Sequence, residues 1–313
     1  MKIVNEERTA QGLPFVQLIP ALEAMFASGC CVPLRHSHVV GTEESGQGTL
    51  LLMPAWQEGG RLGVKTVSIY PDNQKRGLPG LHSVFILYDA CTGVPLALLD
   101  GNVITSRRTA AASALAAKYL SRPDSRSLLV VGAGRVASLV PEAYREVRPI
   151  EEVNVWDINP TLAASLVDHL RRTGLRAQVV PDLEAAAAEA DIISCATLSN
   201  QPLIQGGWLR PGTHLDLIGS FTPAMRESDD ECFRVSTVFV DTDEAPKKSG
   251  DILIPVANGA FDQSSIACDL TSLCRGQHPG RKTREEITLF KAVGTALEDL
   301  AAASLAFDAQ RAA

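Results

Sequence analysis

Hydrophobic and polar residues alternate over short distances in the first hundred residues of the chain, after one apolar segment with helical spacing at residues 18–27. Turn-forming residues separate the alternating runs, and this pattern predicts antiparallel strands with hairpin-like connections. An alanine-rich segment, residues 108–120, follows and predicts a helix. The predicted strands are Thr49–Met53, Gly63–Ile69, Ser83–Tyr88 and Pro95–Leu99.

From residue 127 the pattern changes to short apolar runs separated by amphipathic segments. Strands that alternate with helices predict βαβ units and a parallel, doubly wound sheet. The predicted strands are 128–131, 153–156, 178–180, 191–196, 214–218 and 237–240, and the clearest helices are 161–172, 183–190 and 295–307. The expected fold class is therefore α/β, with a Rossmann-type doubly wound parallel sheet and a second, β-rich α+β domain.

The length of the chain, 313 residues, suits two domains. The helix-breaking run Ser121-Arg-Pro-Asp marks the expected boundary. We expect residues 122–286 to form the Rossmann-type domain, and residues 1–121 with 287–313 to form the β-rich domain.

Composition and charge argue against several classes of binding partner and of metal site. The net charge of −7 argues against a nucleic-acid or acidic membrane surface as partner. No apolar run is long enough for a membrane helix, and residues 1–8 lack a signal-peptide core. The seven scattered cysteines support neither a disulfide framework nor a zinc site, and His36 and His38 have no further ligand at useful spacing. We expect a cytoplasmic protein without a metal site.

The sharpest local motif is Gly132-x-Gly134-x-x-Ala137, which directly follows the predicted strand 128–131. In a dinucleotide-binding turn, the first glycine permits the tight bend, the second admits a pyrophosphate and a small third residue lets helix and strand pack closely. Arg135 and Val136 lie within this turn and are included among the expected cofactor residues. The alternative is a glycine turn with no ligand. Pro141 is expected to kink the helix that follows.

An acidic residue, Asp157, ends the next predicted strand, 23 residues after Gly134. An acid at this position accepts hydrogen bonds from a ribose diol and repels a 2′-phosphate, so it favours NAD(H), while NADP(H) stays open. The alternative is a turn or capping role before Asn159-Pro160.

Three cations lie in apolar contexts: Arg35, Lys65 inside a predicted strand, and Arg108 at the start of the alanine-rich segment. A charge in a half-buried strand is costly without a counter-ion. These cations could converge on a substrate carboxylate, with an arginine fork supplying paired hydrogen bonds. The alternative is that Arg35 and Lys65 face solvent or form internal salt bridges.

Several segments, in order and at similar spacing, resemble the ornithine cyclodeaminase/μ-crystallin family across nearly the whole chain. They include the segments at residues 52–55, 63–67, 99–105, 107–116, 212–214, 249–255 and 288–300, together with the glycine motif. The resemblance implies a homodimer with the β-rich domain at its interface and an active site between the domains. It also implies that Arg35, Lys65 and Arg108 bind a substrate carboxylate.

One departure distinguishes activities within that family. Its ornithine cyclodeaminases carry Gly-Gly-Asp-x-Pro after the fifth Rossmann strand, and the aspartate handles the amino groups of ornithine. Here the segment is Gly219-Ser-Phe-Thr-Pro, with Phe221 in place of the aspartate. A phenyl ring cannot accept a proton or pair with an ammonium, but it can pack against an apolar ring. The sequence therefore resembles the ketimine reductases more, unless Phe221 is only a core residue.

Family position adds further residues. Thr197, Ile218 and Val293, with Ala292, are expected at the cofactor. His82 is expected near the substrate, where it could donate a proton, or else it is a surface histidine. Lys65 or a water could equally deliver that proton.

The expected reaction is the NAD(P)H-dependent reduction of Δ1-pyrroline-2-carboxylate or Δ1-piperideine-2-carboxylate to L-proline or L-pipecolate. The alternatives are an ornithine cyclodeaminase, an alanine dehydrogenase and a non-catalytic binding protein.

Overall fold

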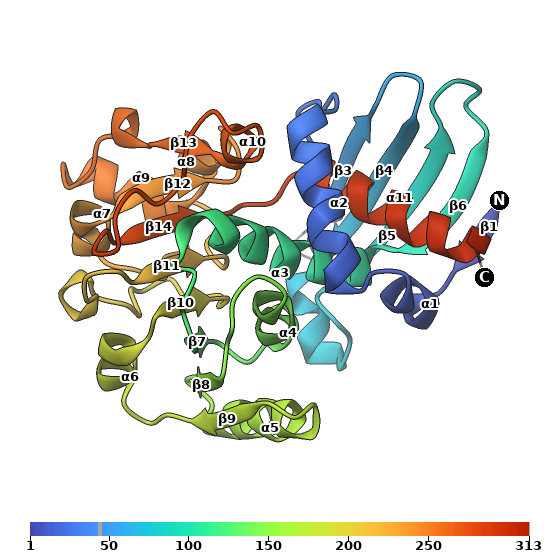
Figure 1. The fold of residues 1–313 in the computed structure, drawn as a ribbon. Coiled ribbons are helices and arrows are strands. Elements are labelled where there is room, and N and C mark those ends of the chain that lie inside the picture. The colour runs from blue at the N-terminus through green and yellow to red at the C-terminus, as the bar shows by residue number, and fades with distance from the viewer. Residues whose placement is uncertain (43–45, 313) are drawn as a thin grey trace. The chain divides into compact units, whose positions relative to one another are not determined.

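A computed structural model of the chain describes residues 1–42 and 46–312. The chain divides into two compact units, which Figure 1 shows with their helices and strands. The first unit comprises Met1–Arg108 and Thr295–Ala313, and the second comprises Thr109–Gly294. The expected boundaries lay at residues 121/122 and 286/287. They differ because one continuous helix carries the chain past residue 108, and because residues 288–291 form a strand of the second unit.

The first unit contains a six-stranded sheet with the order β1-β6-β5-β4-β3-β2. All neighbouring strands are antiparallel except the β1–β6 pair. The predicted hairpins are thus confirmed, with longer strands than the sequence indicated. The strands are β1 (Lys2–Val4), β2 (His36–Val40), β3 (Gly48–Trp56), β4 (Arg61–Ile69), β5 (Leu81–Asp89) and β6 (Pro95–Asp100).

Helices of the first unit cover one face of this sheet. Helix α11 (Ala296–Ala312) packs on β3, β4 and β5, and α2 (Phe15–Ser28) packs on α11 (Figure 1). Helix α1 (Glu6–Gln11) follows β1 in the chain, and Asn5 caps its start because the Asn5 side chain accepts the Arg8 N–H. Successive side chains of a strand point to opposite faces of the sheet. The buried residues of β4 and β5 therefore lie on the face that the helices cover.

Helix α3 (Gly101–Leu120) begins seven residues before the predicted helix, so Arg108 lies inside it and does not open it. The Asp100 carboxylate accepts the Val103 N–H at 2.8 Å and so caps the helix. A side chain at Gly101 would lie 2.2 Å from Ser83 Oγ, so the sequence needs glycine where the helix starts.

The second unit contains an eight-stranded, wholly parallel sheet with the order β13-β12-β14-β11-β10-β7-β8-β9. The chain runs outward from β7 to β9 and then returns to the other side of β7. This reversal is the topological switch point of a Rossmann-type sheet, so the predicted fold class is confirmed. The strands are β7 (Ser127–Val131), β8 (Glu152–Trp156), β9 (Arg176–Val179), β10 (Ile192–Cys195), β11 (His214–Leu217), β12 (Thr237–Val240), β13 (Cys268–Asp269) and β14 (Thr288–Lys291).

The helices of the second unit begin at side-chain caps in most cases, as at Asn159 before α5 and Asp182 before α6. The segment after the glycine motif differs from the expected helix. A short 3₁₀ turn occupies residues 137–139, and Pro141 lies in the first turn of the next helix, where a missing N–H costs nothing. The helices are α4 (Val140–Arg145), α5 (Pro160–Arg172), α6 (Leu183–Glu189), α7 (Asp230–Val235), α8 (Ala245–Lys248), α9 (Gly250–Ala257) and α10 (Leu270–Cys274).

Among the helices that the structure describes, none combines the length and the apolar character that crossing a bilayer requires.

Candidate functional site

The residues expected at the cofactor lie together at one edge of the parallel sheet. Because all eight strands run in the same direction, their carboxyl ends share an edge, here called the carboxyl edge. Open α/β sheets bind ligands at this edge, beside the switch point. The structure places five expected residues one or two positions after a strand end: Gly132, Asp157, Thr197, Ile218 and Val293.

The glycine turn after β7 has the geometry that a dinucleotide needs. Gly132 has a φ of +108°, and a Cβ there would lie 2.7 Å from the Ala196 carbonyl oxygen, so only glycine fits. Gly134 is exposed, and a Cβ built on it meets no atom within 4 Å. Ala137 is fully buried, which allows close packing behind the turn. The turn therefore fits a pyrophosphate that approaches the backbone at Gly134.

Asp157 lies beside this turn. One carboxylate oxygen accepts the Ala133 N–H at 2.8 Å and the other accepts the Asn159 N–H at 2.7 Å. Asn159 itself caps α5 by accepting the Thr161 N–H. A carboxylate has about four lone-pair positions, so Asp157 retains acceptors for a ribose diol while it braces the turn.

Two further carboxylates accept hydrogen bonds from residues at the same edge. The sequence did not predict either of them as a site residue. Glu227 accepts the N–H and the hydroxyl of Thr197 at 2.7 and 2.8 Å. Asp241 accepts the N–H groups of Val293 and Gly294 at 2.7 and 2.6 Å. Both acids are fully buried. Burial raises the pKa of Glu227 to about 7, against the lowering effect of Lys291.

In the first unit, four charged residues form a buried group that we call the lysine–arginine cluster: Lys65, Arg108, Glu298 and Asp299. Lys65 Nζ lies 2.7 Å from Asp299 Oδ2. The Arg108 guanidinium donates to Asp299 Oδ1 at 3.0 Å and to Glu298 Oε2 at 2.5 Å. Lys65 also donates to the hydroxyl of Thr105 at 3.3 Å. The two predicted cations are thus brought together, and internal ion pairs hold them.

The electrostatics of this cluster shift the pKa of Lys65 and the pKa of Asp299. Burial lowers the pKa of Lys65 below its ordinary value, and Arg108 lowers it further, while Asp299 opposes both. Burial alone would raise the pKa of Asp299, but Lys65 and Arg108 outweigh it and lower that pKa. Glu298 and Asp299 were not predicted because acidic residues at the start of a helix usually face solvent.

The remaining substrate candidates of the first unit are Arg35 and His82. Arg35 is half-buried and directly precedes His36, which opens β2 and pairs with Leu52. His82 is exposed, and its strand neighbours Ser83 and Phe85 carry the buried face, where Phe85 pairs with Lys65. Alternation along β5 therefore directs His82 away from the face that holds Lys65.

Phe221 follows β11 at the carboxyl edge and leaves 50% of its surface exposed. The alternative that Phe221 is only a core residue is therefore wrong. The phenyl ring is therefore accessible at the carboxyl edge.

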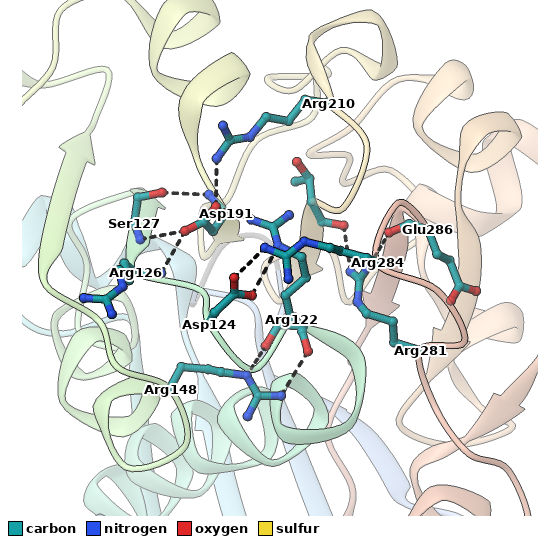
Figure 2. Close-up of polar contacts among 12 residues, drawn as sticks. Arg122, Asp124, Arg126, Ser127, Arg148, Asp191, Arg210, Arg281, Arg284 and Glu286 are labelled. Carbon is teal, nitrogen blue, oxygen red and sulfur yellow. Dashed lines mark hydrogen bonds and ion pairs between the residues drawn. The ribbon is translucent and has the colours of Figure 1, made fainter.

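The opposite, amino-terminal edge of the sheet carries a different group of charges, which Figure 2 shows. Two adjoining cavities of about 240 Å³ each lie there, and Arg122 and Arg284 line both. Arg122 and Arg210 pair with Asp191, and Arg284 pairs with Asp124. Asp191 also accepts the backbone N–H groups of Arg126 and Ser127. This network ties loops to the strand starts and lies away from the residues expected to bind cofactor.

The switch-point sheet of the second unit, with its glycine turn at the carboxyl edge, defines a Rossmann-type dinucleotide-binding unit. The first unit buries the two cations Lys65 and Arg108. The chain belongs to the ornithine cyclodeaminase/mu-crystallin family, which it matches over residues 3–313.

Relatives and solved structures of known activity resemble it over most of their length. It is 42% identical to a Delta(1)-pyrroline-2-carboxylate reductase of Paracoccus denitrificans, over 82% of each chain. The Delta(1)-pyrroline-2-carboxylate reductase of Thermococcus litoralis, solved with NADH and L-proline, superposes with a TM-score of 0.91 at 37% identity, covering 98% of this chain and 97% of that one. An archaeal alanine dehydrogenase dimer with bound NAD also has a TM-score of 0.91, at 30% identity, covering 100% and 96%.

Proposed function

We propose that this chain is a ketimine reductase that converts Δ1-pyrroline-2-carboxylate or Δ1-piperideine-2-carboxylate to L-proline or L-pipecolate with a reduced nicotinamide dinucleotide. The relatives with this activity support the proposal. The observation that carries it is Phe221, which is half-exposed at the carboxyl edge. A cyclodeaminase needs a carboxylate at this position, whereas a small cyclic imine needs an apolar contact.

The cations of the first unit supply the contacts for the substrate carboxylate. Arg108 presents a guanidinium fork whose geometry matches a carboxylate, and Arg35 adds a second positive group. Glu298 and Asp299 hold the Arg108 side chain, so it is oriented before substrate arrives. A fixed carboxylate in turn fixes the imine carbon next to it. We leave His82 out of this set because it faces the other side of the sheet.

Lys65 is the proposed proton donor. The dinucleotide, when bound, supplies the hydride that adds to the imine carbon. An iminium accepts hydride better than a neutral imine, so the ring nitrogen must gain a proton. The lowered pKa of Lys65 makes its ammonium a stronger acid than an ordinary lysine, and Asp299 keeps it oriented. Solvent then returns the proton to Lys65.

NADH is the proposed preferred coenzyme. The Asp157 carboxylate stands next to the glycine turn, where it can accept hydrogen bonds from a ribose diol. A 2′-phosphate at the same place would meet a second negative charge. NADPH is expected to bind more weakly.

A homodimer through the sheet of the first unit is proposed as the working assembly. On the face opposite α11, one apolar row crosses neighbouring strands in register, and its members are Ile3, Leu98, Ile86, Val64 and Pro54. All are partly or largely exposed. A contiguous apolar surface of this kind marks a protein interface. Light scattering would show a monomer for Ile86→Arg if the row forms the interface.

The cytoplasm is the proposed compartment. All seven cysteines are described, and each is a free thiol. Free thiols, two of them exposed at Cys31 and Cys91, suit a reducing environment.

Absorbance at 340 nm tests the function directly. Purified protein is mixed with NADH or NADPH and with each of the two imines, and the rates are compared. Rapid oxidation of NADH with either imine is the expected result. No oxidation, together with ammonia release from ornithine and NAD⁺, would replace the proposal with cyclodeamination.

A further inference from the structure

The loop that follows β10, residues 196–204, is attached at both ends to one short segment, residues 225–228. The carbonyl oxygen of Glu227 accepts the N–H groups of Leu203 and Ile204 at 2.8 and 3.0 Å. The Arg226 N–H donates to the Ser199 carbonyl at 2.8 Å. The Glu227 carboxylate holds the start of the loop at Thr197. A single residue therefore fixes both ends of a loop at the carboxyl edge.

The same carboxylate reaches the neighbouring loop after β11. Its second oxygen accepts the Gly219 N–H at 2.6 Å. A Cβ at Gly219 would lie 2.0 Å from the Thr197 carbonyl oxygen and 2.4 Å from Glu227 Oε1. The two loops and the carboxylate thus meet with no room for a larger residue. Since β10 and β11 are adjacent strands, the carboxylate sets the spacing between their loops.

We propose that Glu227 is a positioning residue for the dinucleotide, which it serves by fixing Thr197 and Gly219 at the carboxyl edge without touching the ligand. This inference rests on the proposed function, because it assumes that the dinucleotide binds at this edge. Loops held in a binding-competent shape reduce the ordering cost of binding. The carboxylate therefore acts on affinity for the dinucleotide and leaves affinity for the imine unchanged.

Charged neighbours surround Glu227 on several elements. Asp251 on α9 accepts the backbone N–H of Glu227 at 2.8 Å and pairs with Lys291 of β14 at 3.3 Å. Burial raises the pKa of Cys195 of β10, and the charge of Glu227 raises it further. Asp251 raises the pKa of Glu227 and Lys291 lowers it, while burial has the largest effect and brings it to about 7. Below that pH protonation replaces the carboxylate by a neutral carboxyl with an O–H on one oxygen, which weakens the three hydrogen bonds that it accepts, so dinucleotide affinity is expected to fall as pH falls through about 7.

Glu227→Gln tests the inference, because glutamine keeps the size and removes one acceptor oxygen. Calorimetry gives the Kd of NADH, and kinetics at saturating NADH give the imine KM. We expect the Kd of NADH to rise about tenfold, the imine KM to stay within about twofold, and the pH dependence of Kd near neutrality to disappear. Should the variant fail to fold, the wild-type Kd of NADH measured from pH 6 to 8.5 decides instead, and a flat profile would overturn the inference.

Asp216→Asn is the matched control. Asp216 is another fully buried carboxylate of the same unit, but its partners are the hydroxyls of Ser113, Tyr144 and Ser194. An equal loss of NADH affinity in this variant would mean general destabilisation and overturn the positioning role, as would an unchanged Kd in Glu227→Gln. Wild-type protein that binds no NADH would instead contradict the proposed function itself.

Discussion

The two units each bury a group of charges, and the two groups are organised in opposite ways. In the lysine–arginine cluster, two carboxylates hold two cations, and the cations are the proposed substrate contacts. Around Glu227 and Asp251, carboxylates accept backbone N–H groups, and the cation Lys291 is fully buried. We therefore propose that the first group offers cations to a substrate, whereas the second group holds loops in place.

The difference follows from the ligand that each unit is proposed to bind. A small carboxylate needs fixed positive charge, which a buried cation can offer only if acids keep it charged and oriented. A dinucleotide needs backbone that approaches it closely, so the second unit uses glycines and braced amides. Substitutions in the first unit should therefore act mainly on the chemistry and on the imine, and those in the second mainly on the coenzyme.

Lys65→Met should have the largest effect. It removes the proposed proton donor, and loss of general acid catalysis typically costs about 10²–10⁴-fold in rate. We expect kcat/KM for the imine to fall by that range while the Kd of NADH is unchanged. Lys75→Met, at an exposed lysine of the same unit, is the control and should behave like wild type. Full activity in Lys65→Met would remove Lys65 from the chemistry.

Arg108→Lys should act on substrate binding. It keeps the positive charge opposite Glu298 and Asp299 but loses the fork, and a charge-assisted contact contributes about 1.5–3 kcal/mol. The imine KM should rise roughly 10- to 150-fold. Arg107→Lys is the neighbouring control, because the Arg107 side chain donates to the Leu13 carbonyl and covers the Phe15 ring. Equal KM values in the two variants would contradict the assignment.

Asp299→Asn should change the pH dependence of kcat. Activity requires protonated Lys65, so kcat should fall as pH rises through the lowered pKa of that lysine. Asp299 opposes this lowering, and its removal should move the alkaline fall in kcat to still lower pH. The pH profiles of kcat for both proteins give the result. A profile that does not move would show that Asp299 does not set the protonation of Lys65.

The glycine pair should give the smallest effect on chemistry and separate stability from binding. Gly134→Ala adds a methyl group where no protein atom lies within 4 Å, so the melting temperature should stay near wild type while the Kd of NADH rises about tenfold. Gly132→Ala forces a φ of +108° on alanine and should cost about 1–3 kcal/mol of stability. Unchanged NADH affinity in Gly134→Ala would mean that no ligand approaches this turn.

Much of the fold could be predicted because buried positions recur at a regular spacing, which appears in the sequence as a hydrophobic pattern. Strands β3 to β6 show this pattern as alternation, and β7, β8 and β10 show it as short apolar runs. The glycine turn is recognisable from its motif. Strand β14 does not show the pattern, because its four residues include a buried Lys291 and a buried Thr288 that only their partners explain. For this reason the second unit extends to Gly294, beyond the boundary that was expected at residues 286/287.

The supporting acids could not be predicted either. Glu227, Asp251, Glu298 and Asp299 look like surface residues in a one-dimensional pattern, since acids are rarely buried without partners. Their partners are distant in sequence: Lys65 lies far from Asp299, and Thr197 from Glu227. Resemblance to the family identified the residues expected to meet ligands, and only the folded chain shows what holds those residues in place.

The late position of β14 and α11 also bears on how the chain is made. Strand β14 lies between β11 and β12, and α11 covers the sheet of the first unit, so both units depend on residues 288–312 for their packing. Domains usually fold one after another during synthesis. A chain made only as far as residue 287 would leave apolar strands of both units uncovered at once, and residues 288–312 cover both.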